Sequence, residues 1–202
     1  MASTTMTYGI LTSGKSTPGS VKWMVGHELI YAEQAIAEAE AWIYERLRVR
    51  EMQEEAALTF SAATSTKALP TGFQQPIRLM IDGYGKLPYR REDDFPNITD
   101  SDGELPSGTP SCWTVLGSNI VFDTKLSEEL TGRLWFYGTP AALTTTNFLT
   151  DRFPTLFRHA ILARAYAHRN RADMLATEEL LAEKAIAVAN AINDDFRYGQ
   201  EL

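Results

Sequence analysis

Residues 9–16 read GILTSGKS and match the phosphate-binding pattern G-x-x-x-x-G-K-S. In a working phosphate loop, a buried strand leads into the turn and a helix follows it, so that backbone amides and a lysine surround the phosphates. Here the preceding MASTTMTY offers little apolar strand material, and Pro18-Gly19 interrupts the chain just after Lys15. Nucleotide binding is therefore a remote alternative, and we interpret residues 1–25 as an irregular, flexible arm.

The other residues that often do chemistry are three histidines and one cysteine: His27, His159, His168 and Cys112. The histidines lack metal-ligand spacing, and a single cysteine makes neither an internal disulfide nor a metal site. Acidic pairs such as Glu54-Glu55 and Glu178-Glu179 are expected on solvated helix faces. The sequence thus predicts no catalytic residue, no metal, no cofactor and no enzymatic activity.

A run of arginines followed by glutamates is a candidate interaction site, comprising Arg46, Arg48, Arg50, Glu51, Glu54 and Glu55. On a helix, Arg46 and Arg50 would share one side and Arg48 would project from another. The planar guanidinium group suits bidentate pairing with carboxylates. Two interpretations stay open: ion pairs between neighbouring subunits, or ion pairs within one chain.

Acidic residues outnumber basic ones by 26 to 19, which gives a net charge of −7. A protein that grips DNA by neutralising phosphates is therefore not the expected class. One acidic segment contains no Lys or Arg and comprises Glu92, Asp93, Asp94, Asp100, Asp102 and Glu104. Prolines and glycines predict a long exposed loop over residues 92–110. The segment is either a solvated loop or a surface that repels DNA moving past it.

The elements expected to carry these residues begin with a long helix within residues 26–56. Apolar residues from about Glu28 to Met52 recur with a helical period, while Glu33 and Glu40 mark a polar face. Several alanines permit a neighbouring helix to approach closely. Residues 57–146 then change to β-branched and aromatic residues punctuated by Gly and Pro, which predicts a small, mainly antiparallel β region. Gly117-Ser118 is expected to turn a hairpin between residues 113–116 and 119–122.

The helical period returns over residues 147–195. We expect one helix capped by Asp151, with Pro154 in its first turn, ending near Arg169, and a second helix over about 172–194. The short connection predicts an antiparallel hairpin. In the second helix one stripe is predicted to be core: Leu181, Ala185, Val188 and Ile192. The tail, residues 196–202, either docks on another protein or frays, and Phe196, Arg197 and Tyr198 are its candidate portal or tail contacts.

The predicted fold class is α+β, with a helical scaffold of one long N-terminal helix and a C-terminal antiparallel hairpin, and with a small β region inserted. No run reaches the roughly 18 apolar residues that a membrane helix needs, and the N-terminus does not resemble a secretion signal. The expectation is a chain with neither a membrane span nor a signal peptide.

Two blocks of the sequence carry a resemblance to a known family: Arg46–Pro70 and Gly132–His168. The second contains the aromatic strand LWFY, then Thr139-Pro140, a polar stretch at Asn147–Asp151, and Phe153-Pro154 at a helix start. These features resemble the head-to-tail adaptor (neck) proteins of short-tailed bacteriophages, over roughly Gly26–Tyr198.

The resemblance implies a structural virion protein rather than an enzyme. It implies a closed ring of about twelve copies that docks beneath the portal, presents a surface to the tail nozzle and tail fibres, and extends the channel for DNA ejection. Packaged DNA would pass through without specific binding, and assembly would take place in the host bacterial cytoplasm. The alternative within the same class is a stopper or tail-completion ring. A DNA-binding scaffold protein is a third hypothesis, against which the acidic composition argues.

Overall fold

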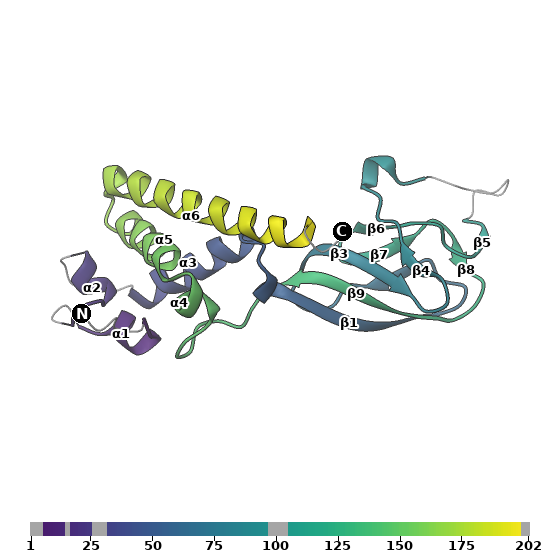
Figure 1. Ribbon diagram of the computed structural model, residues 1–202, viewed down its shortest axis with the longest axis horizontal. Helices are drawn as coiled ribbons and strands as arrows, with labels where there is room; N and C mark the ends of the chain where they lie inside the picture. The colour runs from purple at the N-terminus through teal and green to yellow at the C-terminus, as the bar shows by residue number, and fades with distance from the viewer. Residues whose placement is uncertain (1–5, 15–16, 26–31, 97–104, 199–202) are drawn as a thin grey trace. The chain divides into compact units, whose positions relative to one another are not determined.

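The computed structural model describes residues 6–14, 17–25, 32–96 and 105–198, with side chains except those of Trp23 and residues 194–198. The chain forms two compact units. We call Met1–Glu51 together with Pro140–Leu202 the helical unit, and Met52–Thr139 the β unit. Most of the elements of both units are labelled in Figure 1.

The largest sheet of the β unit has four antiparallel strands in the order β1-β9-β3-β4. These strands are β1 (Gln53–Phe60), β9 (Leu130–Gly138), β3 (Phe73–Ile81) and β4 (Gly85–Leu87). Strands β9 and β3 approach closely at Gly132, where an added Cβ would lie 2.5 Å from the carbonyl oxygen of Met80. A side chain at this position would therefore push the two strands apart.

Two smaller sheets complete the β unit, with strand orders β2-β7-β6 and β5-β8. Their strands are β2 (Thr66–Ala68), β7 (Asn119–Phe122), β6 (Trp113–Leu116), β5 (Ser107–Gly108) and β8 (Lys125–Leu126). The hairpin predicted at Gly117-Ser118 is confirmed, since Leu116 pairs with Asn119 and Gly117 has φ 58°. Apolar side chains from these strands and from the large sheet form one core, in which the Phe60 and Phe122 rings meet edge to face.

The predicted fold class, a helical scaffold with a small β insertion, is wrong. The described residues form nine strands in three sheets, and strand accounts for 26% of the chain beside 41% helix. The prediction relied on apolar segments, so it did not include the polar residues with which some long strands begin, such as Gln53–Glu55 of β1. It also missed strands of two or three residues, because such short strands show no alternating pattern.

The helical unit is built from α1 (Tyr8–Thr12), α2 (Val21–Met24), α3 (Ala32–Arg46), α4 (Phe148–Arg152), α5 (Pro154–Ala167) and α6 (Ala172–Tyr198). Helix α5 packs against both α3 and α6. Its buried residues lie around its whole circumference, from Leu156 and Phe157 to Ala165 and Tyr166, as expected for a central helix. Helices α3 and α6 flank it.

The start of the C-terminal helices differs from the prediction. Asp151 is not the cap; Asn147 caps α4 instead, with its side chain accepting from the backbone N–H groups of Leu149 and Thr150. Thr150 completes a capping box by bonding back to the Asn147 backbone. Pro154 stands in the first turn of α5, as expected.

Helix α3 ends earlier than the sequence pattern suggested. The Asn190 side chain accepts from the backbone N–H of Arg48 (2.7 Å) and donates to the carbonyl of Arg46 (3.0 Å). A side chain of α6 thus satisfies backbone groups that another helical turn would have used. The chain continues through a short 3-10 helix, η1 (Arg50–Met52), into β1.

Candidate assembly surface

Helix α6 carries two apolar stripes, of which the chain covers one. Ala182, Ile186 and Ala189 are buried in the helical unit. The second stripe comprises Leu181, Ala185, Val188 and Ile192, and we call it the outer stripe. Leu181 is 39% exposed, Val188 60% and Ile192 54%, so a substantial apolar surface faces solvent.

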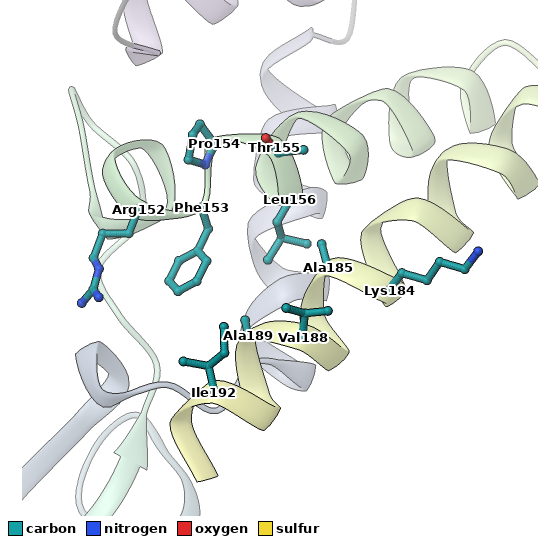
Figure 2. Close-up of a pocket in the computed structure, with 10 residues that line it drawn as sticks. All are labelled: Arg152, Phe153, Pro154, Thr155, Leu156, Lys184, Ala185, Val188, Ala189 and Ile192. Atoms are coloured by element: carbon teal, nitrogen blue, oxygen red, sulfur yellow. The ribbon is translucent and has the colours of Figure 1, made fainter. Parts of the chain in front are cut away.

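The outer stripe borders a groove of about 450 Å³ between the α4–α5 junction and α6. Its lining is mainly apolar and comprises Arg152, Phe153, Pro154, Thr155, Leu156, Lys184, Ala185, Val188, Ala189 and Ile192. Figure 2 shows the Phe153 ring directed toward the α6 side chains, and the Lys184 ammonium pointing away from the apolar floor. The lining residues include two cations and no anion. Such a surface suits an apolar partner more than a polar small molecule.

The prediction that Leu181, Ala185, Val188 and Ile192 form core is therefore wrong for the chain by itself. A helical period identifies apolar stripes but not which stripe finds a neighbour. In α6 the stripe with the smaller residues, centred on Ala182 and Ala189, packs inside the unit. The stripe with Val188 and Ile192 is left outside.

The arginines of the predicted interaction site make contacts within their own chain. Arg46 pairs with Glu45 (2.9 Å) and its guanidinium lies over the Trp42 ring, 4.7 Å from the centroid. Arg48 donates to the backbone carbonyls of Tyr44, Glu45 and Leu47. Because α3 ends at Arg46, the expected i,i+4 relation between Arg46 and Arg50 does not exist. Arg50 is exposed in η1 and forms no ion pair among the described residues.

The glutamates of that site are distributed over both units. Glu51 forms an ion pair with Arg152 of α4, in the helical unit. Glu54 and Glu55 belong to β1, so the expectation that this acidic pair lies on a helix is wrong. Glu55 pairs with Arg133 of β9 at 3.5 Å, and the Glu54 carboxylate lies against Gly138. Glu51 and Glu55 thus pair with arginines outside the predicted site.

The acidic segment is described only in part. Glu92, Asp93 and Asp94 form an exposed 3-10 helix, η2, whereas Asp100, Asp102 and Glu104 lie outside the described residues. The candidate tail contacts Phe196 and Arg197 fall in the last turns of α6, as does Tyr198, but their side chains also lie outside the description.

The phosphate-loop pattern does not form a loop at its start, because Tyr8–Thr12 is helical as α1. Lys15 and Ser16 lie outside the described residues, as does His27. His159 contacts Glu178 (2.6 Å) and His168 contacts Glu38 (3.0 Å), both across helix pairs of the unit. In the part of the chain that the structure describes, no three His, Cys, Asp or Glu residues gather where a metal ion could bind, and no helix is long and apolar enough to span a membrane.

One polar residue of structural importance was assigned to the wrong face. Glu40 was expected on the polar side of its helix, but it is 5% exposed. Its carboxylate accepts hydrogen bonds from the backbone N–H of Leu143 (3.0 and 3.1 Å), from Asn147 Nδ2 (2.8 Å) and from the Tyr44 hydroxyl (3.2 Å). Burial, and then the nearby Glu40 carboxylate, raise the pKa of Tyr44. Glu40 therefore holds the segment before α4 against α3.

Comparison with known protein families gives a match over most of the chain. The model of a family described as SU10 adaptor protein matches residues 22–200 of the chain. No curated protein matches it.

Proposed function

The chain belongs to the SU10 adaptor protein family, a family of phage head-to-tail adaptors, and we propose that copies of it form a closed ring between the portal and the tail. The resemblance found in the sequence is thereby confirmed. The protein is a structural adaptor of the virion neck that associates with portal and tail components. Membership of a structural family also agrees with the expectation that the chain is not an enzyme.

The observation that supports ring formation is the outer stripe of α6. Three of its residues are large and between 39% and 60% exposed, beside a groove floored by apolar side chains. Large exposed apolar patches are uncommon on chains that work alone, whereas a subunit keeps such residues for its neighbours. The stripe therefore favours a protein that completes its packing in an assembly.

The resemblance to the adaptor family also suggests the copy number of the ring, its contacts and its channel. The ring would hold about twelve copies, contact the tail nozzle and tail fibres, and extend the DNA channel, with assembly in the host cytoplasm. The tail residues Phe196, Arg197 and Tyr198 remain candidate portal or tail contacts. The candidate subunit contacts remain Arg46, Arg48, Arg50, Glu51, Glu54 and Glu55. The acidic segment would face the channel and repel passing DNA. A stopper or tail-completion ring is the alternative, and portal binding by this chain without any other neck protein would argue against it.

Portal binding is the experiment that tests this function. The chain is mixed with the portal ring of the same virus, and the products are separated by size exclusion with light scattering. We expect a complex that is heavier than the portal by the mass of one complete ring of 22.5 kDa chains. A portal that elutes unchanged beside free chain would contradict the adaptor role.

A further inference from the structure

A ring of identical subunits needs two different contact faces on each copy, because head-to-tail contacts join one surface to another. The helical unit offers two such faces. Helix α5 is central and packs against α3 and α6, which leaves each flanking helix with a side turned away from the unit. The outer stripe lies on the free side of α6.

The free side of α3 has the opposite character. Glu33, Ala37, Ala41 and Glu45 follow one another at four-residue steps, and all four are exposed. Ala32, Ala35 and Ala39, by contrast, are buried inside the unit. The two exposed alanines form a shallow strip of small side chains with a carboxylate at each end. We call these four residues the alanine strip.

The two faces complement each other in shape and in charge. Large side chains project from the outer stripe, and the alanine strip leaves room for a helix to approach closely. Lys184 lies beside the outer stripe and has no ion pair among the described residues. Glu33 likewise has none among them, and Glu45 pairs with its exposed neighbour Arg46. A cation on one face thus meets carboxylates on the other.

We propose that the outer stripe of one copy packs against the alanine strip of the next copy, so that α6 and α3 of adjacent subunits form the contact that closes the ring. This contact rests on the proposed ring-forming function and names the partner of its apolar surface. Val188 would lie over Ala37 and Ala41, and Lys184, one helical turn away, would face the glutamate at one end of the strip. The same geometry repeats at every interface and leaves no outer stripe uncovered.

Cysteine cross-linking between two separately purified variants tests the contact. A tagged Val188→Cys chain is mixed with an untagged Ala41→Cys chain and with the portal ring, and is then mildly oxidised. Because the cysteines sit on different chains, a tagged–untagged dimer reports a contact between copies. The native Cys112 is buried, which raises the pKa of its thiol and slows its reaction. Ala187→Cys replaces Val188→Cys as the matched control, since Ala187 is exposed on α6 but lies off the stripe.

The expected result is a mixed dimer for Val188→Cys with Ala41→Cys, and little for the Ala187→Cys control. A portal-bound ring that gives no mixed dimer, or that links two Val188→Cys chains instead, would overturn the contact and leave the adaptor function standing. Failure of the unmodified chain to bind the portal would overturn the proposed function itself.

Charge reversal provides a second test that needs no oxidation. Lys184→Glu should weaken ring formation on the portal about tenfold, as should Glu33→Lys combined with Glu45→Lys. In a ring that alternates the two reversed chains, opposite charges face each other at every interface, so the mixture should assemble better than either chain alone. Equal assembly of the reversed chains and the original would reject the charge pairing on which the proposal draws.

Discussion

Glu40 shows what a single buried carboxylate contributes to the helical unit. It accepts hydrogen bonds from three residues, including a backbone amide of the segment that leads into α4. The helical period of the sequence assigned Glu40 to the polar face, because a glutamate counts as polar even where hydrogen bonds allow it to be buried. Two of the three donor residues, Leu143 and Asn147, are about a hundred residues away along the chain, so a local sequence pattern does not reveal them.

Replacing Glu40 by Ala should destabilise the chain by about 3 kcal/mol, because the Leu143 N–H and the Asn147 amide lose a buried acceptor. Glu40→Gln should cost less, since an amide oxygen can still accept. The free energy of unfolding is measured in urea. Glu33→Ala on the same helix is the control and should change stability by less than about 0.5 kcal/mol. Equal stability of the two alanine variants would contradict the role of Glu40.

Tyr44 should make the free energy of unfolding depend on pH in the alkaline range. Its folded-state pKa is raised above the ordinary value of 10.0 by burial and by Glu40. Above pH 10 the unfolded chain loses the phenol proton while the folded chain keeps it. The contribution of Tyr44 to the free energy of unfolding is therefore intact below pH 10 and is lost as the pH rises further. The free energy of unfolding should therefore fall less steeply in Tyr44→Phe, by up to about 1.4 kcal/mol per pH unit. Parallel curves for both proteins between pH 9 and pH 11 would contradict this.

At the level of elements, the sequence predicted best what local chemistry determines. The β6–β7 hairpin was placed correctly, because Gly117 supplies the positive φ that a two-residue turn needs. The end of α3 was predicted wrongly, because the hydrogen bonds that terminate this helix come from Asn190, which is distant in the sequence. The outer stripe was mistaken for core, since a helix with two apolar stripes does not reveal which one its own chain covers.

The Asn190 contact can be tested as an element boundary. Asn190→Ala removes both hydrogen bonds to the α3 terminus and should lower the free energy of unfolding by about 2 kcal/mol. Asn190→Asp keeps the acceptor for Arg48 N–H but loses the donor to the Arg46 carbonyl. Its free energy of unfolding should therefore fall less than that of Asn190→Ala. Thermal unfolding followed by circular dichroism gives the order of the three proteins. If Asn190→Asp were less stable than Asn190→Ala, the assignment of the acceptor would be wrong.

At the scale of the whole molecule, the outer stripe of α6 is a substantial apolar surface that the folded chain leaves exposed. Val188→Asp should leave the stability of the free chain almost unchanged, because Val188 is 60% exposed. It should weaken assembly on the portal at least about tenfold, because a charge would enter an apolar contact. Ala187→Asp carries the same charge at an exposed position off the stripe and should assemble normally. The two properties are read from urea unfolding and from light scattering of portal mixtures.

Hydroxyl-radical footprinting of the free and the portal-bound chain shows whether the outer stripe is covered in the assembly, because it reports the exposure of individual side chains. We expect Leu181, Val188 and Ile192 to be modified in the free chain and to become protected on the portal. Ile186, which the chain already buries, should be protected in both states. Equal modification of the outer stripe before and after portal binding would contradict the claim that this surface completes its packing in the assembled ring.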